Sequence, residues 1–241
     1  METVHSTQTK SGRKAWIEGV ARALPVVLGY IPVGFAFGVL SQKAGISLWN
    51  ALLMSFLVYA GSAQLIAAGL IGAGTPALSI VLTTFVVNLR HLLMSAALSP
   101  YLKKWRKREL AVFSYQLTDE TFALHSVQFA KGMPGKPEVF AVNITSQASW
   151  VFGTWLGVTA GQLITDVKPL ALDYALPAMF IALLLLQLRD RLQIYVALLT
   201  GLLAVGMLLL GFDRWNVIIA TVLGATIGTV VELRWNRKRF S

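Results

Sequence analysis

The sequence alternates between long apolar stretches and short polar connections over most of its length. Eight hydrophobic segments can be marked to within about three residues, at roughly 19–40, 48–70, 76–99, 110–130, 139–164, 170–188, 192–210 and 215–233. An α-helix needs about 20 apolar residues to cross a bilayer, and the short alternating segments of a transmembrane β-barrel are absent. The pattern predicts an all-α, polytopic membrane protein with about seven or eight hydrophobic segments.

The composition supports this fold class. The 241 residues are 56% hydrophobic and 13% charged, and they include no Cys. A soluble domain of this size would carry about 25% charged residues, so these charges are too few to cover a soluble core. Disordered, coiled-coil and disulfide-stapled proteins are excluded by the same values.

The distribution of the basic residues argues against nucleic-acid binding. The chain has 21 Lys and Arg against 11 Asp and Glu, but these cations gather beside the apolar segments, at Lys10 to Lys14, Lys103 to Arg108, Arg189 and Arg191, and Arg234 to Arg239. Basic clusters flanking hydrophobic spans hold a membrane protein in one orientation. We expect a polar cytoplasmic tail over 1–18 with no cleavable signal peptide, one transmembrane domain over 19–233 and a basic tail over 234–241.

The basic loops conflict with a simple count of crossings. Three segments separate the N-terminal tail from the basic loop at 100–109, and three more separate that loop from Arg189. Because an odd number of crossings cannot keep both ends on one side, either one segment in each triplet does not cross fully or a weaker basic end lies outside. Segment 48–70 is one candidate for a broken or re-entrant helix, because 60–64 interrupts its apolar run. Segment 110–130, with Asp119, Glu120 and His125, is the other, and an internal repeat would explain both.

The first segment combines helix-breaking and small residues. Pro25 and Pro32 each remove a backbone donor, and Gly34 and Gly38 lie one turn apart. This pattern fits either a kinked helix with a close packing face or a hinge or unwound stretch that lines the substrate cavity. Gly224 and Gly228 in the last segment indicate a packing face.

Polar residues inside the hydrophobic segments follow helical stripes. Spacings of three and four residues place each set on one helix face, and polar groups at membrane depth usually face a bundle interior or a hydrated cavity. The stripes predict a central cavity formed by segments 48–70, 76–99, 110–130 and 139–164; interhelical hydrogen bonds are the competing explanation. We assign as candidate substrate-binding residues Tyr59, Ser62, Gln64, Asn88, Arg90, Asn143 and Gln147.

The ionisable residues suit a zwitterionic ligand. Arg90 can bind a carboxylate through two hydrogen bonds, and Asp119 or Glu120 can pair with an ammonium group or carry a proton. Alternatively, Arg90 pairs with one of these acids as a structural bridge. His91 and His125 titrate near neutral pH, so they are candidates for proton coupling or gating together with Asp119 and Glu120, although either could serve packing alone.

Enzymatic motifs are not found in the sequence. It has no HExxH, no P-loop and no Cys/His cluster, and Ser62 lacks the setting of an intramembrane serine protease. We therefore expect no enzyme, no cofactor and no metal, and any active transport must use an ion or substrate gradient.

Several motifs in this order resemble the AzlC family, the large subunit of two-component branched-chain amino-acid exporters of the YgaZ or BrnF type. They are the Pro and Gly pattern from Pro25 to Gly38, Tyr59-Ala60-Gly61-Ser62-Ala63-Gln64, Asn88-Leu89-Arg90-His91, Thr118-Asp119-Glu120-Thr121-Phe122-Ala123, the stretch from Trp150 to Gly161, and Leu172 to Ala178. The resemblance covers about residues 15 to 235. It implies a proton-driven exporter of Val, Leu, Ile or Met in the bacterial cytoplasmic membrane, acting with a small AzlD-type membrane subunit. A membrane subunit for assembly or regulation, without a transport pathway, and a transporter or channel for another small metabolite remain the alternatives.

Overall fold

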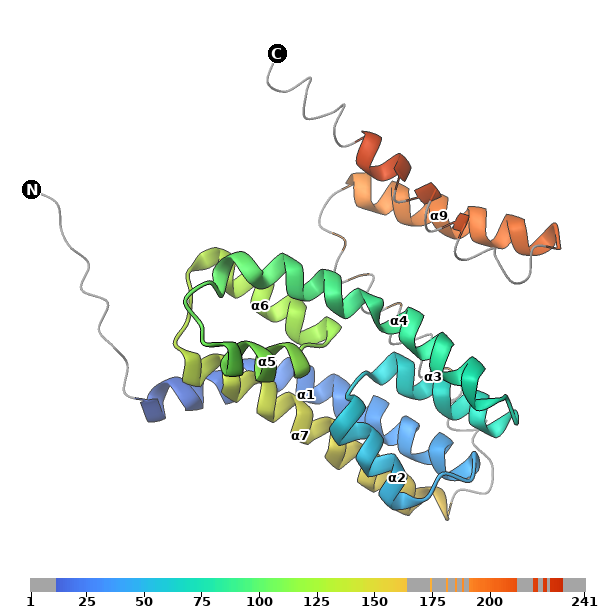
Figure 1. Cartoon of the computed structure of the whole chain (residues 1–241), viewed down its shortest axis with the longest axis horizontal. Coiled ribbons are helices and arrows are strands. Elements are labelled where there is room, and N and C mark those ends of the chain that lie inside the picture. Colours follow the sequence, from blue (N-terminus) through green and yellow to red (C-terminus); the bar gives the residue numbers. More distant parts are fainter. Residues whose placement is uncertain are drawn as a thin grey trace, which may run out of the picture. The chain divides into compact units, whose positions relative to one another are not determined.

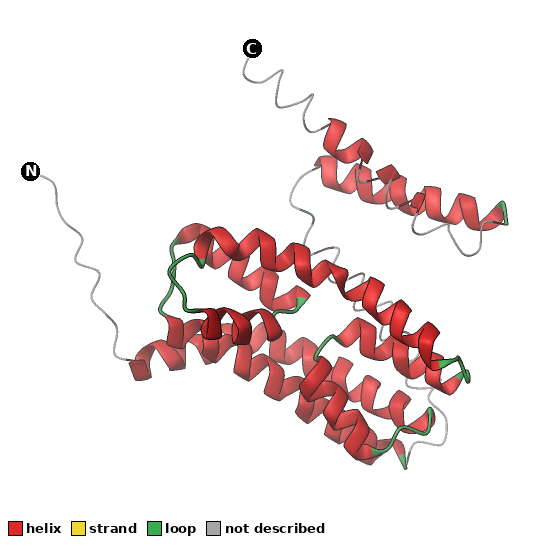
Figure 2. Cartoon of the chain, in the orientation of Figure 1, coloured by secondary structure: helices red, strands yellow, loops and turns green. Residues whose placement is uncertain are grey.

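The computed structural model describes residues 12–163 and 191–211, together with 174, 181, 185, 188, 219–220, 223–224 and 226–231. The chain divides into two compact units, Met1–Ile181 and Ala182–Ser241. All regular structure in the described residues is helical (Figure 2). Segment 170–188 of the sequence prediction lies almost entirely outside the described residues, and segment 215–233 is described only in part.

Two long parallel helices, α1 (Gly12–Lys43) and α7 (Lys136–Gly161), form the centre of the first unit. Gly19 lies against Glu138 and Ala141, and Gly38 lies against Thr154 and Val158. A Cβ atom at Gly34, Gly38, Gly153 or Gly157 would meet backbone atoms of the opposite helix. The small residues of the first segment therefore form a packing face, and α1 stays helical through Pro25 and Pro32, so this stretch is not unwound.

The second hydrophobic segment folds into a hairpin, called hairpin A here (Leu48–Gly72). It contains α2 (Leu48–Leu53), a π-helical turn η1 (Met54–Val58) and α3 (Gly61–Gly72). Its tip lies halfway along α7, where Ser55 bonds to Thr154 at 2.8 Å and the Phe56 carbonyl accepts from Gln147 at 3.1 Å. Its last residue, Gly72, returns to Ala44 at the C-terminal end of α1. Both ends of hairpin A thus lie at the same end of the α1–α7 pair.

The turn of hairpin A depends on an unusual backbone conformation at Tyr59. This residue has φ 42° and ψ 48°, the left-handed region, and it is the one non-glycine residue with positive φ in the described chain. A left-handed residue with a Cβ costs roughly 1–2 kcal/mol, so surrounding contacts must hold it in place. Ala60 then adopts φ −134° and ψ 86°, and α3 begins at Gly61. The segment is therefore broken as predicted, but the break lies at Tyr59 and Ala60, and Gly61 to Gln64 already belong to α3.

The fourth segment forms a second hairpin, hairpin B (Lys107–Lys131), which enters the bundle from the end opposite to hairpin A. It consists of α5 (Lys107–Tyr115) and α6 (Asp119–Lys131). Glu109 at its start contacts Lys136 at 2.7 Å, Gln116 at its tip bonds to Gln147 at 2.9 Å, and Gln128 on the returning helix bonds to Glu138 at 2.8 Å. Both ends of hairpin B therefore lie at the N-terminal end of α1 and α7, and the predicted break in segment 110–130 is confirmed.

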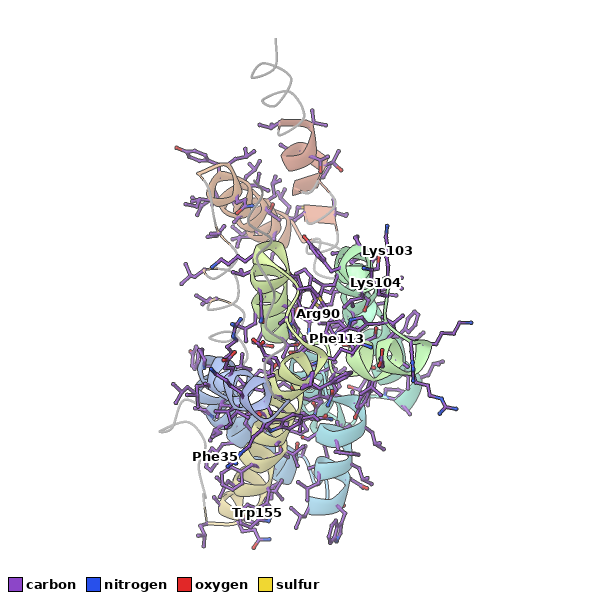
Figure 3. The ribbon with its side chains drawn as sticks, turned by 90° about the vertical axis from the view of Figure 1, so that its left-hand side faces the viewer. Phe35, Arg90, Lys103, Lys104, Phe113 and Trp155 are labelled. Carbon is purple, nitrogen blue, oxygen red and sulfur yellow. The ribbon has the colours of Figure 1, made fainter. Side chains whose placement is uncertain are left out.

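Helix α4 (Ala77–Leu98), extended by a 3₁₀ turn η2 (Ser99–Tyr101), connects the two hairpins and runs opposite to α1 (Figure 1). Helices α1 and α4 each run the length of the first unit in opposite directions, whereas hairpin A enters and leaves at one end. The N-terminal end of α1 and the basic loop after α4 therefore lie at the same end. That loop is fixed there by Trp105, whose ring lies 5.4 Å from Phe140 and 5.6 Å from the Lys136 ammonium. Figure 3 shows the neighbouring Lys103 and Lys104 side chains of this loop. Helix α1 with hairpin A, and α4 with hairpin B, have the topology of an inverted repeat.

The outer face of α4 is apolar and largely uncovered. Eight of its large apolar side chains are 45–71% exposed: Leu78, Val81, Leu82, Phe85, Val86, Leu89, Leu92 and Leu93. In the described part of the chain, three helices are long and apolar enough to cross a membrane, namely Gly12–Lys43, Ala77–Tyr101 and Leu192–Leu209. An apolar exterior around a polar interior is the distribution that a lipid environment requires.

The second unit contains α9 (Arg191–Leu209). Gly224 and Gly228 contact Thr200 and Val196 of this helix. The packing face predicted for these two glycines is therefore confirmed.

Candidate functional site

The tips of the two hairpins meet in a pocket at mid-length of α1 and α7. Residues from hairpin A, hairpin B, α1, α4 and α7 line it: Tyr30, Tyr59, Ala60, Gly61, Ser62, Arg90, His91, Thr118, Asp119, Glu120 and Trp150. The open space at its centre would admit about one water molecule. The pocket is thus closed in this conformation.

Arg90 connects the two hairpins across the pocket. Its Nη1 lies 2.9 Å from Asp119 Oδ2, at the start of α6, and its Nη2 donates a hydrogen bond to Ser62 Oγ, at the start of α3. The third guanidinium nitrogen, Nε, is buried and has no partner among the described residues. Arg90 therefore both ties the hairpins together and keeps a free donor.

The N-termini of α3 and α6 both begin at the pocket, but their first turns differ. In α6, the Thr118 and Thr121 side chains cap each other's backbone amides, and Asp119 and Glu120 lie in the first turn. In α3, Ala60 offers no side-chain cap and the first turn contains no acid. Unpaired amides and the helix dipole favour an anion at such an end. The α3 end with Arg90 attracts a negative group, and the α6 end attracts a positive one.

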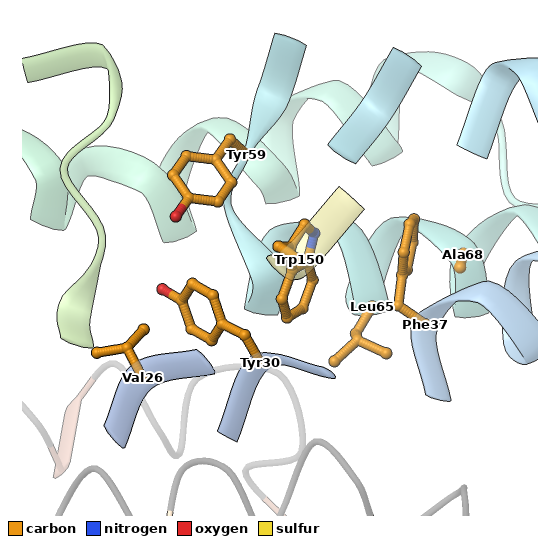
Figure 4. Close-up of a cluster of buried hydrophobic side chains, with 7 residues drawn as sticks. All are labelled: Val26, Tyr30, Phe37, Tyr59, Leu65, Ala68 and Trp150. Atoms are coloured by element: carbon orange, nitrogen blue, oxygen red, sulfur yellow. The ribbon is translucent and has the colours of Figure 1, made fainter. Parts of the chain in front are cut away.

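An aromatic cluster forms another wall of the pocket. The ring of Tyr30 lies 5.3 Å from Trp150 and 6.3 Å from Tyr59, both edge to face. Figure 4 shows these three rings with Val26, Phe37, Leu65 and Ala68 around them. The Tyr30 hydroxyl donates to Glu120 Oε2 at 2.6 Å, whereas the buried Tyr59 hydroxyl has no partner among the described residues. The pocket thus offers an apolar wall with one unused hydroxyl.

Six of the predicted site residues meet in the pocket: Tyr59, Ser62, Arg90, His91, Asp119 and Glu120. Of the two acids, Asp119 is the one that forms an ion pair with Arg90 in the structure. Five others are not among the lining residues: Gln64, Asn88, Asn143, Gln147 and His125.

Four of these five make contacts between helices. Gln64 accepts from the Trp150 indole at 3.1 Å and holds the turn at the Ala60 amide, and Gln147 bonds to Gln116 and to the Phe56 carbonyl. His125 pairs with Asn143 at 2.7 Å. The fifth, Asn88 on α4, has a buried Oδ1 with no partner among the described residues. These side chains are polar contacts of the bundle, as the competing explanation of the stripes expects.

Five pocket residues were not predicted as site residues: Tyr30, Ala60, Gly61, Thr118 and Trp150. Tyr30 carries the only side-chain hydroxyl between Trp16 and Leu40 of the sequence. A polar group in such an apolar segment is a signal that could have identified it. Thr118 and Trp150 belong to predicted polar stripes, but spacing alone does not say which stripe members reach the cavity.

Comparison with known proteins gives consistent results. The AzlC protein family matches residues 25–164. The chain is 30% identical to the inner membrane protein YgaZ of Escherichia coli K12, over 94% of this chain and 93% of the relative. It is 29% identical to the branched-chain amino acid transport protein AzlC of Bacillus subtilis 168, over 88% of this chain and 82% of the relative. An uncharacterized membrane protein of Archaeoglobus fulgidus is 34% identical over 86% of this chain. No solved structure matches.

Proposed function

Because this chain belongs to the AzlC family of membrane proteins, we propose that it is the permease subunit of an exporter for branched-chain amino acids. The substrates are Val, Leu and Ile, with Met as a further substrate, and they leave the bacterial cytoplasm through the inner membrane. The chain acts as a secondary transporter and not as an enzyme. The Bacillus subtilis relative, named as a branched-chain amino acid transport protein, supports the substrate class.

The arrangement around Arg90 is the observation that carries the proposal. Two oppositely directed hairpins meet at mid-depth beside long crossing helices, and discontinuous helices of this kind build the substrate sites of many secondary transporters. The substrate carboxylate binds to Arg90 and to the uncapped amides of α3. The unpartnered Tyr59 hydroxyl supplies one further hydrogen bond.

The acids of hairpin B complete the site for an amino acid. Asp119 and Glu120 begin α6 on the opposite side of the pocket and bind the ammonium group, while the rings of Tyr30, Tyr59 and Trp150 face the aliphatic side chain. Asp119 or Glu120 also carries the coupling proton. His91 lies beside Arg90 in the pocket and acts in gating.

Substrate binding requires the pocket to open. Arg90 is engaged by Ser62 and Asp119, and the remaining space suits one water molecule. The carboxylate therefore competes with Asp119 for the guanidinium group. Loss of this bridge releases the hairpin tips from each other, which couples occupancy to movement of the hairpins.

The basic end of the unit faces the cytoplasm. The start of α1, the loop at 102–106 and Lys136 share this end, which carries Arg13, Lys14, Arg22, Lys103, Lys104 and Arg106. Within residues 12–163, Lys43 is the one Lys or Arg near the opposite end. This asymmetry follows the positive-inside rule. A small AzlD-type subunit completes the exporter.

A second candidate function is an assembly or regulatory subunit without its own pathway. The direct helix contacts of Gln64, Asn143 and Gln147 favour it, because these stripe residues join helices and do not line the pocket. A transporter for another small metabolite is the third candidate. Such a transporter would use the same charged pocket, and a different substrate group would pack against its aromatic rings.

Export from intact cells tests the proposal. A deletion strain is fed dipeptides that release Val, Leu, Ile or Met, and intracellular accumulation is measured with and without the restored gene. Accumulation of these four amino acids alone supports the proposal, and accumulation of none of them contradicts it. Restoration by Arg90→Ala as well as by the wild type would favour the subunit without a pathway.

A further inference from the structure

A buried histidine lies outside the pocket, between it and the basic end of the unit. His125 on α6 is fully buried, and the rings of Phe113 and Phe129 lie 5.3 Å and 5.2 Å from its own ring. Its Nε2 pairs with Asn143 Oδ1 at 2.7 Å. Its Nδ1 has no partner among the described residues. A buried imidazole with a free nitrogen can accept a proton.

A chain of hydroxyl groups leads to the pocket from Thr121, which lies one turn before His125 on α6. Thr121 Oγ1 lies 3.1 Å from Thr118 Oγ1, which lies 2.6 Å from the Tyr30 hydroxyl. The Tyr30 hydroxyl donates to Glu120 at 2.6 Å. Because each hydroxyl has one hydrogen, Thr118 donates to Tyr30 when Tyr30 donates to Glu120. The Thr121 hydroxyl has Thr118 Oγ1 and the Thr118 and Gln116 carbonyls within reach as acceptors. When Thr121 donates to Thr118 Oγ1, the three hydrogen bonds all point toward Glu120.

One helical turn of α6 separates this chain of hydroxyl groups from His125. Thr121 and His125 are four residues apart on α6, so their side chains are neighbours on one face of the helix, with Cβ atoms about 5–6 Å apart. Close to them, Gln116 Oε1 at the end of α5 and Asn143 Nδ2 on α7 are also buried and unpartnered among the described residues. Buried polar groups without protein partners are usually satisfied by water.

On the other side of His125, polar contacts continue to the basic end. Gln128, one turn further along α6, donates to Glu138 at 2.8 Å, and Glu138 pairs with Arg22 at 2.9 Å. The Arg22 side chain is 48% exposed, so this pair reaches the surface. A further charged pair near this end is Glu109 with Lys136, from α5 and α7, and α4 presents the apolar Met94 and Leu98.

We propose that His125, Thr121, Thr118 and Tyr30 form a proton path between Glu120 in the pocket and the Glu138–Arg22 pair at the basic end. The path rests on the proposed function, because it carries the coupling proton of that exporter from the pocket toward the cytoplasm. Protonated Glu120 gives its proton to the Tyr30 oxygen, Tyr30, Thr118 and Thr121 each pass their own hydrogen onward, and water passes one to His125 Nδ1. One proton leaves Glu120 and one arrives at His125, which becomes neutral again when it releases the proton toward the basic end.

Proteoliposomes that contain the full chain with its small subunit separate the proton path from substrate binding. Counterflow of labelled leucine requires substrate exchange alone, whereas transport driven by an imposed pH gradient also requires proton movement. Thr121→Val removes the hydroxyl at almost unchanged shape, and Thr121→Ser keeps it as the matched control. We expect Thr121→Val to retain counterflow and to lose gradient-driven transport by about tenfold or more, with Thr121→Ser close to wild type.

The outcomes distinguish the two proposals. Absence of leucine counterflow in the wild type would contradict the proposed function. Wild-type counterflow together with unchanged gradient-driven transport in Thr121→Val would overturn the proton path, and so would equal loss of both activities in a folded protein. If Thr121→Val does not fold, His125→Gln decides by the same comparison, because Gln can still bond to Asn143 but cannot hold a proton.

Discussion

Arg90 on α4 lies 2.9 Å from Asp119 on hairpin B, and its other terminal nitrogen donates to Ser62 on hairpin A. One guanidinium group thus joins the tips of two hairpins that enter the bundle from opposite ends. That bridge closes the pocket, and the same guanidinium group offers the charge that a carboxylate would take.

Replacing Arg90 should strongly reduce transport without removing the protein from the membrane. A charged hydrogen bond contributes about 1.5–3 kcal/mol, so Arg90→Ala should lower leucine efflux by about 10- to 100-fold. Arg90→Lys keeps the charge but loses the planar fork of separate donor nitrogens that reaches both Asp119 and Ser62, and should retain intermediate efflux. Immunoblots of the membrane fraction control for protein level, and normal efflux by Arg90→Ala would remove Arg90 from the site.

Asp119→Asn distinguishes a proton role from a purely structural pair. The amide can still accept a hydrogen bond from Arg90 but carries no charge and takes up no proton. Efflux that persists but no longer depends on external pH is expected if Asp119 carries the proton. If the pH dependence is unchanged while efflux persists, the proton is carried elsewhere, and Glu120→Gln is then the variant to measure.

The hydroxyl of Tyr59 should matter for transport but not for stability. It is buried and unpartnered among the described residues, so Tyr59→Phe should change the free energy of unfolding by less than about 0.5 kcal/mol. Loss of one hydrogen bond to substrate, about 0.5–1.5 kcal/mol, should weaken leucine transport by about 2- to 12-fold. Thermal unfolding in detergent and leucine transport at several concentrations measure the two effects. Lower stability with unchanged transport would show that the hydroxyl has a structural role.

The close packing of α1 on α7 should not tolerate a methyl group. A Cβ atom at Gly157 would meet the backbone of Phe35, which cannot move aside as a side chain can. Overpacking of this kind costs about 1–3 kcal/mol, so Gly157→Ala should lower the Tm. Gly29→Ala is the matched control in α1, because nothing lies within 4 Å of its new Cβ atom, and its Tm should be unchanged or higher. Equal Tm values for the two variants would contradict the helix pairing.

The anchor of hairpin B should weaken in acid. The hydrogen bond from Lys136 lowers the pKa of Glu109 below its ordinary value. A carboxylate with a lowered pKa stabilises the folded state above the ordinary pKa of about 4.3, and that stabilisation is lost as the pH falls through the folded-state pKa. Wild-type protein should therefore lose more stability than Lys136→Met on acidification below about pH 4.3. Parallel unfolding curves for the two proteins would show that the pair adds nothing.

Sequence patterns predicted the interruptions but not the direction of the chain after them. Gly61 and the polar residues after it mark the break in hairpin A, and Asp119 and Glu120 mark the start of α6. Whether a broken segment continues or turns back is decided by tertiary contacts, such as Glu109 with Lys136 and Gly72 with Ala44. No local pattern contains that information.

The charged residues of the site could be predicted from the sequence because charge is scarce inside the hydrophobic segments. Arg90, Asp119 and Glu120 are costly at membrane depth, and the structure brings all three to one pocket. Gln64, Asn143 and Gln147 follow the same helical spacing yet bond across helix contacts. Helical spacing shows which face of a helix carries the polar residues but not which neighbouring element that face contacts. Tyr30 was missed because its segment has no polar stripe.

Leucine counterflow into proteoliposomes is the most direct test of the Arg90 pocket as an amino-acid site. Vesicles loaded with unlabelled leucine and containing the wild-type chain with its small subunit should accumulate labelled leucine, and excess valine, isoleucine or methionine should compete. Vesicles with Arg90→Ala should not accumulate it. Equal accumulation in wild-type and Arg90→Ala vesicles, or none in either, would contradict the account.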